Sequence, residues 1–360
     1  MFPVLILKTG ALGDVLRTTS ILPGFAERHP GLTTTWVTAP GAVDLVAHHP
    51  LVGETLALDP GDEGAVRELS ERLSGREFAR VLSLDDELPM CRLASRVADP
   101  SAKPGVLSGA YLADGSQTQD GARAYTPDVA PWFDMGLLSV HGKAEADRRK
   151  VQNQASHAAI YAGMFGIRMG EPELPLEPVV IERARGRLAS LAGRRLVGLN
   201  TGSGGRWESK KLSVERTVAL ALELEAARPG QLGFVLLGGP EEAERNAELT
   251  RELESRVALV DTGTGNGLLE FAGLVGELDL LVTSDSLALH VAVARKRPVL
   301  CFFAPTSAAE IELYGRGEKV LSTAADYCSY AKDADTKTLT VERLLAPALR
   351  CLDGAGSREV

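Results

Sequence analysis

The segment KTGALGDVLRTT, residues 8–19, places a carboxylate, Asp14, directly after a turn that contains Gly10 and Gly13. The apolar run before the turn predicts a buried strand, and residues 14–30 predict a helix. A carboxylate at this junction either caps the helix by accepting backbone N–H groups or acts as a base that removes a proton from a substrate. The two glycines would let a ligand approach the backbone, and a helix N-terminus favours an anion. The segment alone leaves both roles of Asp14 open.

Two common nucleotide-binding loops do not fit this segment. It lacks the third glycine and the spacing of Gly-x-Gly-x-x-Gly, and no Gly-Lys-Ser/Thr follows it. The second predicted strand ends in WVTAP, without the acidic residue that would bind the adenosine ribose of a dinucleotide. The sequence therefore disfavours both a Rossmann-type dehydrogenase and a P-loop nucleotidase.

A second group of residues suited to chemistry follows a predicted strand in the other half of the chain. The segment NTGSGGRWESKKL, residues 200–212, contains Thr201, Gly202 and Ser203 and then Lys210. The backbone amides of a glycine-rich turn and a mobile ammonium group suit a diphosphate. We therefore expect this segment to contact the phosphates of a nucleotide.

The segment LLGGPEEAERN, residues 236–246, predicts a strand, a tight turn and a helix that begins with two acidic residues. Glu241 is the first of them. Its carboxylate either balances the helix dipole or accepts hydrogen bonds from ribose hydroxyls, and the sequence leaves both interpretations open.

The segment TSDSLALHVAVARKRPVLCFFAPT, residues 283–306, brings three polar groups to one strand end. Asp285 ends the predicted strand, Ser286 opens a helix, and His290 lies one helical turn further on the same face. Taken one by one, the histidine suits a buried core and the serine suits a helix cap. Together with the N–H groups of the helix start, they predict a site for a polyhydroxyl compound that carries phosphate.

For these segments to form common sites, the strands that precede them must have their carboxyl ends side by side in a sheet. β-rich runs alternate with helical patterns through most of the chain, which predicts an α/β fold with doubly wound parallel sheets. The predicted strands are residues 4–8, 33–38, 54–59, 79–85, 195–200, 233–239, 257–261, 278–285 and 298–303. The predicted helices are residues 14–30, 62–75, 152–165, 213–227, 241–254, 267–276 and 286–294.

Two domains are expected, because single cores stop growing well below 360 residues. The first covers residues 1–168 and the second residues 181–352, with a Pro-containing linker at 169–180 and a tail at 353–360. Residues 108–150 are rich in Gly, Ser, Asp and Gln and predict an irregular insertion in the first domain. Its aromatic side chains either pin the insertion to the domain or form a wall against a substrate: Tyr111, Tyr125, Trp132 and Phe133.

Composition narrows the class of protein. A net charge of −9 disfavours a nucleic-acid partner, although residues 146–150, 193–195 and 295–297 are locally basic. No apolar stretch approaches the roughly 18 residues of a membrane span, and the N-terminal apolar run is too short for a signal peptide, so we expect a cytoplasmic protein. The four cysteines have no metal-ligand spacing and are expected to be reduced thiols. The pair Asp85-Asp86 is interpreted as a strand end and a helix start rather than a metal site.

The chain resembles glycosyltransferase family 9, whose best-known members are the ADP-heptose:lipopolysaccharide heptosyltransferases. The resemblance rests on four blocks in the same order: ILKTGALGDVLRTTSILPGF, GLNTGSGGRWESKKLSVER, VLLGGPEE and LVTSDSLALHVAVARKRPVLCFFAPT. It implies a GT-B fold, in which two Rossmann-like domains face each other across a cleft. The N-terminal domain would bind the acceptor, and the C-terminal domain would bind the nucleotide-sugar.

The resemblance also assigns roles to the residues that match the family's motifs. Asp14 would be the general base, with Gly10 and Gly13 on the acceptor side. The donor-binding positions would be Thr201, Gly202, Ser203, Lys210, Glu241, Asp285, Ser286, Leu287 and His290. Leu287 stands where the family usually has Gly, the lysine block reads Lys210-Lys211-Leu212, and Cys328 is the one cysteine kept in residues 326–345.

The function implied is an inverting, metal-independent transfer of a sugar, heptose by family default, to a glycan or glycolipid. The donor would be ADP-heptose, with no further cofactor, no nucleic-acid partner and a place in lipopolysaccharide biosynthesis. Peripheral association with the cytoplasmic face of the inner membrane is left open, because family acceptors are often lipid-linked. Two other classes remain as alternatives: a non-catalytic nucleotide-sugar-binding protein and a nucleotide-sugar epimerase.

Overall fold

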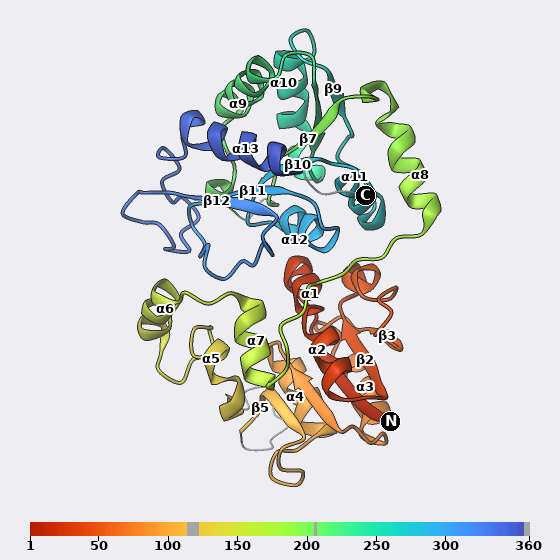
Figure 1. The fold of residues 1–360 in the computed structure, drawn as a ribbon. Coiled ribbons are helices and arrows are strands. Elements are labelled where there is room, and N and C mark those ends of the chain that lie inside the picture. Colours follow the sequence, from red (N-terminus) through yellow and green to blue (C-terminus); the bar gives the residue numbers. More distant parts are fainter. Residues whose placement is uncertain (114–121, 205–206, 356–360) are drawn as a thin grey trace. The chain divides into compact units, whose positions relative to one another are not determined.

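The computed structural model describes residues 1–113, 122–204 and 207–355. The chain divides into two compact units, Met1–Leu174 and Pro175–Val360, and each unit has its own sheet and helices (Figure 1). The division falls inside the segment 169–180, which the sequence predicts as a linker. Among the described residues, no helix combines the length and apolar character needed to cross a bilayer.

The first unit is built on a six-stranded sheet with the order β3-β2-β1-β4-β5-β6. The strands are β1 (Phe2–Leu7), β2 (Leu32–Thr38), β3 (Glu54–Ala57), β4 (Arg80–Ser83), β5 (Leu107–Leu112) and β6 (Arg123–Tyr125). All neighbours pair in parallel except β5 and β6, which are antiparallel. In the central strand the side chains from Val4 to Leu7 are all buried, as expected for a parallel strand covered on both faces.

Helices cover both faces of this sheet. They are α1 (Leu12–Thr18), α2 (Ile21–Arg28), α3 (Glu63–Ser74), α4 (Leu88–Val97), α5 (Ala130–Phe133), α6 (Lys143–Gln152) and α7 (His157–Phe165), with short 3₁₀ turns at Pro40–Leu45 and Pro127–Val129. Helices α3 and α4 share a hydrophobic core with β1, β2 and β4. Helix α2 packs against α7, where the rings of Phe25 and Phe165 lie 5.6 Å apart. The single helix predicted for 14–30 is two helices, because Pro23 has no N–H group for the carbonyl of Thr19.

The expectation of an irregular segment at 108–150 is wrong for its described residues. They form most of β5, then β6, the turn at Pro127–Val129, α5 and most of α6. One glycine of this segment, Gly109, is required by the sheet itself. Its φ is +132°, and a Cβ there would lie 1.9 Å from the Ser83 carbonyl oxygen, so no side chain fits between β5 and β4. Composition suggested a loop because glycine and polar residues are also used at this sheet edge. Residues 114–121 of the predicted insertion lie outside the described residues.

The second unit has a six-stranded parallel sheet with the order β12-β11-β10-β7-β8-β9. The strands are β7 (Arg195–Asn200), β8 (Leu232–Leu237), β9 (Leu259–Asp261), β10 (Leu280–Ser284), β11 (Val299–Phe303) and β12 (Gly317–Leu321). Counted within the unit, this is the order 3-2-1-4-5-6 of a doubly wound nucleotide-binding sheet. The predicted doubly wound α/β fold is therefore confirmed.

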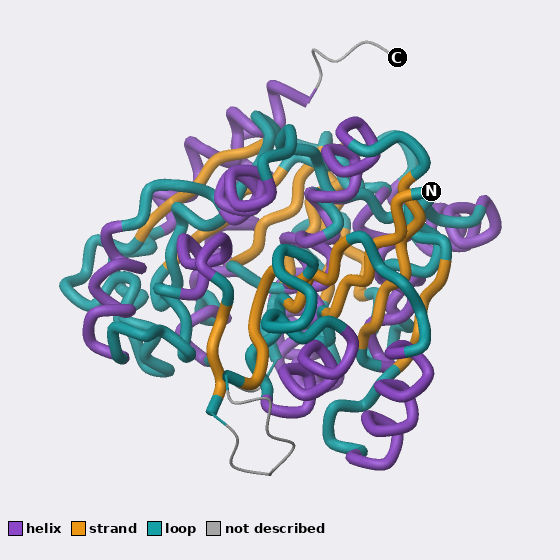
Figure 2. Tube along the Cα trace, turned by 90° about the horizontal axis from the view of Figure 1, so that it is seen from below, coloured by secondary structure: helices purple, strands orange, loops and turns teal. Residues whose placement is uncertain are grey.

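The second unit also packs helices against its sheet; Figure 2 colours helices purple and strands orange. The helices of this unit are α8 (Pro178–Arg187), α9 (Val214–Ala227), α10 (Ala243–Leu253), α11 (Leu268–Gly276), α12 (Leu287–Ala294) and α13 (Val341–Ala355), with 3₁₀ turns at Ala189–Leu191, Glu208–Lys210 and Pro240–Glu242. Helices α9, α10 and α13 share one hydrophobic core with the sheet, and α11 packs against α8 and α12. The sequence analysis did not predict β12 or α13.

Candidate functional site

Each sheet has one place where the direction of strand order reverses, and both candidate clusters lie there. In the first unit the reversal lies between β1 and β4, and in the second between β7 and β10. Ligands of doubly wound sheets bind in the crevice that this reversal opens at the carboxyl ends of the strands. The candidate residues Asp14 and Asp285 both follow strands that border such a crevice.

In the first unit, a buried carboxylate ties the ends of β1 and β4 together. Asp85, which follows β4, forms an ion pair with the Lys8 ammonium and accepts hydrogen bonds from the backbone N–H and the hydroxyl of Thr9, the latter at 2.7 Å. Both side chains are almost fully buried. Burial opposes the charge of Lys8, but the carboxylates of Asp85 and Asp14 outweigh it and raise the pKa of the lysine. Lys8 therefore remains a cation beside Asp14.

Asp14 is not the N-cap residue of α1. The N-cap of α1 is Ala11, and Asp14 is the third residue of the helix, inside its first turn. Its Oδ1 lies 2.8 Å from Nη2 of Arg17, and 37% of its side chain is exposed. Gly13 lies within the helix rather than in the preceding turn, whereas Gly10 lies in the loop after β1. Asp14 is thus a partly exposed carboxylate beside two cations, Lys8 and Arg17, and its role as a base stays a prediction.

The aromatic residues of 108–150 support the packing interpretation, with one addition. The rings of Tyr125 and Phe133 stack at 5.3 Å. Trp132 packs edge-on against His157 and Tyr161 of α7, at 4.9 and 5.6 Å. These contacts pin the segment to the first unit. Trp132 also lies under the Arg17 guanidinium, at 5.3 Å, and so helps to fix the side chain that pairs with Asp14.

In the second unit, Asn200 connects the ends of β7 and β10. Its Nδ2 donates to the Gly202 carbonyl at 2.7 Å, to Thr283 Oγ1 at 3.0 Å and to Ser286 Oγ at 3.3 Å. Ser286 is the N-cap residue of α12, but its side chain does not bond to the amides of the first turn. The Leu289 N–H bonds to the Ser286 carbonyl at 3.1 Å, and the amides before it are the groups that a helix start offers to phosphate. The sequence analysis quoted Asn200 but did not single it out.

Lys210, Asp285 and His290 form one polar cluster at this reversal point. The Lys210 ammonium donates to the Asp285 carbonyl at 2.8 Å and to its Oδ2 at 3.1 Å. His290 Nε2 lies 3.7 Å from Asp285 Oδ1, and the histidine is 8% exposed. Leu287, the first residue of α12, is half-buried beside them. The structure thus brings Lys210 to Asp285, which is 75 positions away in the chain.

Thr201, Gly202 and Ser203 have contacts of their own within the fold. The Thr201 hydroxyl lies 2.6 Å from Asn246 Oδ1 and 3.0 Å from the Leu237 carbonyl oxygen. A Cβ on Gly202 would come within 2.1 Å of the Glu242 carboxyl carbon, so no side chain fits there. Ser203 donates to the Trp207 carbonyl at 3.2 Å. These residues shape the loop after β7 that carries Lys210.

The two acidic residues after β8 differ in environment. Glu241 is exposed on the 3₁₀ turn at Pro240–Glu242. Glu242 is 2% exposed, accepts a hydrogen bond from the Gly239 N–H at 2.9 Å, and lies 3.4 Å from the Lys211 ammonium. The sequence analysis chose Glu241 and missed Glu242. No local signal separates them, because both are glutamates in the same turn.

The described residues contain no group of three or more His, Cys, Asp or Glu side chains placed to hold a metal ion. Asp85 of the Asp85-Asp86 pair is engaged by Lys8 and Thr9 instead. All four cysteines are free and buried. Burial raises the pKa of the Cys301 thiol, which holds it in the neutral form. In the donor cluster, the Lys210 ammonium supplies a positive charge 3.1 Å from Asp285 Oδ2.

Comparison with known families gives one match. The model of the family described as Glycosyltransferase family 9 (heptosyltransferase) matches residues 142–341, more than half of the chain. No curated protein sequence matches the chain.

Solved structures share the fold over its whole length. A glycosyl transferase family 9 protein from Veillonella parvula DSM 2008 has a TM-score of 0.76 at 15% identity, covering 98% of both chains. E. coli ADP-heptose lps heptosyltransferase II has a TM-score of 0.67 at 16% identity, covering 99% of this chain and 100% of the other. E. coli heptosyltransferase WaaC with ADP-2-deoxy-2-fluoro heptose has a TM-score of 0.57 at 18% identity, with the same coverage. These likenesses confirm the predicted GT-B type of α/β fold.

Proposed function

This chain belongs to glycosyltransferase family 9, and from that premise we propose that it transfers a sugar from a nucleotide-diphosphate donor to a hydroxyl of a glycan or glycolipid. The proposed donor is ADP-heptose, since the E. coli relatives are an ADP-heptose enzyme and one described with an ADP-heptose analogue. We propose that the first unit, Met1–Leu174, binds the acceptor and that the second unit, Pro175–Val360, binds the donor.

The observation that carries the proposal is the cluster of Lys210, Asp285 and His290 at the β7–β10 reversal point. A cationic side chain, a carboxylate and uncapped helix amides meet there. The amides of α12 and the Lys210 ammonium would bind the two phosphates and stabilise the negative charge of the leaving diphosphate. The Asp285 carboxylate would accept hydrogen bonds from hydroxyls of the sugar.

The proposed reaction is a single displacement. The acceptor oxygen forms a bond to the anomeric carbon while the bond from that carbon to the diphosphate oxygen breaks, so the configuration inverts. Asp14 takes the proton of the attacking hydroxyl, which is typically worth about 10²–10⁴-fold in rate. Its partly exposed carboxylate is accessible to such a hydroxyl. Lys8 and Arg17 place two positive charges beside this carboxylate.

Metal independence is part of the proposal. It is supported by the Lys210 ammonium, which supplies positive charge where a metal ion would otherwise neutralise the diphosphate. Activity that survives EDTA supports this view, and an absolute requirement for Mg²⁺ would contradict it.

The test of the function is a transfer assay with ADP-heptose and a panel of glycolipid acceptors, in which the release of ADP is measured. Asp14→Asn should bind ADP-heptose as the wild type does, measured by calorimetry, while turnover falls by about 10²-fold or more. Near-normal turnover would remove Asp14 from the mechanism. Reactions without acceptor are the control, because an epimerase would convert the nucleotide-sugar under those conditions.

A further inference from the structure

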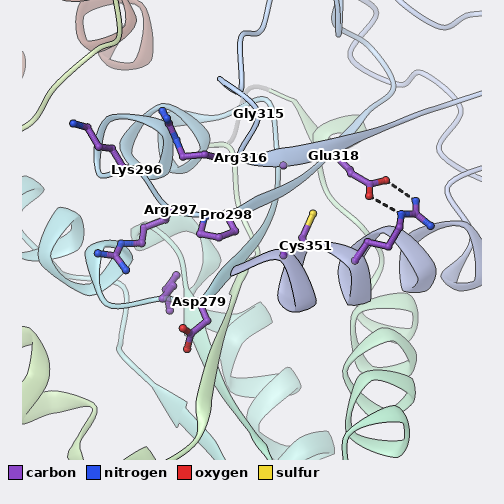
Figure 3. Close-up of a pocket in the computed structure, with 12 residues that line it drawn as sticks. Asp279, Lys296, Arg297, Pro298, Gly315, Arg316, Glu318 and Cys351 are labelled. Atoms are coloured by element: carbon purple, nitrogen blue, oxygen red, sulfur yellow. Dashed lines mark hydrogen bonds and ion pairs between the residues drawn. The ribbon is translucent and has the colours of Figure 1, made fainter. Parts of the chain in front are cut away.

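A cavity of about 410 Å³ lies at the amino-terminal edge of the second sheet (Figure 3). It is lined by residues that come just before β10, β11 and β12, and by the last turns of α13. The donor cluster follows the opposite ends of β7 and β10. Because β10 has five residues, the two places are separated by roughly 16 Å of strand. The cavity is therefore a different place from the proposed donor site.

The lining of this cavity is cationic. It contains Lys296, Arg297, Arg316 and Arg350 against Asp279 and Glu318. The Glu318 carboxylate is occupied by two hydrogen bonds from Arg350, at 2.6 and 2.5 Å. Asp279 accepts a hydrogen bond from the Leu196 N–H at 2.7 Å. Three cationic side chains thus share the cavity with one further carboxylate.

Three of these cations gather at the carboxyl end of α12. Residues 295–297 follow α12, and the backbone N–H groups of Lys296 and Arg297 close the helix by bonding to the Val293 and Ala292 carbonyls, at 3.0 and 2.8 Å. Cations at such a helix end are favourable. Arg316 comes from the turn before β12, and its Nη2 donates to the Val293 carbonyl in the last turn of α12 at 3.5 Å. Its guanidinium also lies over the Tyr314 ring at 5.3 Å, so Arg316 adds its charge to the same helix end and cavity.

One donor group of Arg297 lacks a partner, and its charge acts on a neighbouring arginine. Its Nε is buried and has no hydrogen-bond partner among the described residues. Burial and the nearby positive charge of Arg297 lower the pKa of Arg295. A buried donor without a partner is costly, and this one belongs to a residue that lines the cavity.

The shape of the cavity suits a small molecule with one charged end. Figure 3 shows Lys296, Arg297 and Arg316 on one side, and Cys351 with the Glu318–Arg350 pair on the other. Leu278 and Pro298 add apolar surface to the lining. A volume of about 410 Å³ lies within the usual range for small-molecule sites.

We propose that this cavity binds the phosphate monoester of a small molecule or of a lipid headgroup, independently of the nucleotide-sugar. Arg297 and Arg316 would grip the phosphate, because a guanidinium offers paired donors that match phosphate oxygens. Lys296 would add a point charge. The basic run at 295–297, noted in the sequence, would then serve this cavity.

The experiment titrates the full-length protein with ribose 5-phosphate in a calorimeter, with unphosphorylated ribose as the control ligand. One site is expected, and Arg297→Ala/Arg316→Ala should weaken it at least tenfold. The matched control is Arg251→Ala/Arg256→Ala, which removes two exposed arginines of the same unit and should bind normally. Lys210→Ala, altered at the opposite strand ends, should also bind ribose 5-phosphate normally.

Thermal unfolding of each variant checks that the unit is intact, and Arg297→Gln is the milder variant if the double substitution does not fold. A second arm replaces the soluble probe with vesicles containing phosphatidic acid, compared with phosphatidylcholine vesicles. Both outcomes count only if the Arg297→Ala/Arg316→Ala variant loses the binding. Binding of ribose 5-phosphate then assigns the site to soluble ligands, and binding only to phosphatidic acid vesicles assigns it to lipids. The proposal is overturned if the protein binds neither ribose 5-phosphate nor phosphatidic acid vesicles. It is also overturned if Arg297→Ala/Arg316→Ala and Arg251→Ala/Arg256→Ala bind equally well.

Discussion

Asp14 and Arg17 form an ion pair within α1, with 2.8 Å between Oδ1 and Nη2, and the guanidinium of this pair rests on the ring of Trp132. The carboxylate proposed as the base is thus oriented by a side chain one turn further along its own helix. Trp132 comes from α5, which is packed against α7. The position of the carboxylate therefore depends on a segment more than a hundred residues away in sequence.

Replacing Arg17 by Ala is expected to lower kcat about tenfold, equivalent to about 1.4 kcal/mol, and to leave the KM for the donor unchanged. The physical reason is that Asp14 loses the side chain that orients its carboxylate, whereas the residues proposed to bind the donor are unchanged. Partly exposed ion pairs contribute only about 0.2–1 kcal/mol to stability, so urea unfolding should change little. Arg17→Lys retains the charge but not the planar contact with Trp132, and should recover part of the rate. A raised KM with normal kcat would contradict the positioning role.

Asp85→Asn is expected to destabilise the first unit by about 3–5 kcal/mol, because it leaves the buried Lys8 ammonium without its counter-charge. Urea unfolding followed by tryptophan fluorescence measures this, since Trp36 is fully buried in the first unit. A Trp207→Phe background removes the signal of the tryptophan that lies in the second unit. Asp86→Asn, the matched control at the next position, should change stability by less than about 0.5 kcal/mol. Equal effects of the two substitutions would contradict a special role for Asp85.

The same pair predicts a pH dependence. The pKa of Lys8 is raised above its usual 10.5, so the folded protein holds this proton more tightly than the unfolded chain. Its contribution to stability is complete below pH 10.5 and is lost as the pH rises through the folded-state pKa. The difference in unfolding free energy between wild type and Asp85→Asn should therefore be larger at about pH 8 than at about pH 11. A difference that grows on going to the alkaline side would show that the sign of the Lys8 shift is wrong.

Lys210→Ala should weaken the binding of ADP at least tenfold in calorimetry. The reason is that it removes the Lys210 ammonium, which lies beside Asp285 and is proposed to bind the diphosphate. Lys211→Ala is the neighbouring comparison. Lys211 pairs with Glu208 at 2.8 Å and faces the buried Glu242 at 3.4 Å, so its loss should lower stability more than ADP affinity. The reverse pattern, with ADP binding lost only in the Lys211 variant, would assign the phosphate contact to Lys211.

The sequence predicted those parts of the fold that follow from local pattern. Apolar runs such as residues 4–7 and 233–237 are buried strands, and the alternation with helices led to the doubly wound architecture. The strand β12 was missed because only Val320 and Leu321 of its residues are apolar. Helix α13 was missed although one of its faces is buried, since Pro347 interrupts the pattern that marks a helix.

The candidate site was predictable only where a motif stands at a strand end. Asp285, Ser286 and His290 occupy one such motif, and Lys210 another, and the structure brings them together. Asp85 could not be recognised, because its partner Lys8 is 77 positions away and their pairing depends on β1 and β4 being neighbours. The pairing of two distant strands is a property of the sheet and leaves no mark in either segment alone.

Each unit has a separate sheet and a separate hydrophobic core, joined by the chain near Leu174. Each crevice is therefore built on the sheet and core of its own unit. Evolution can exchange or remodel either half on its own, and a chimera built at this junction from two family members should keep the preference that each half brings. New combinations of substrates would then arise by recombination at a single place in the gene.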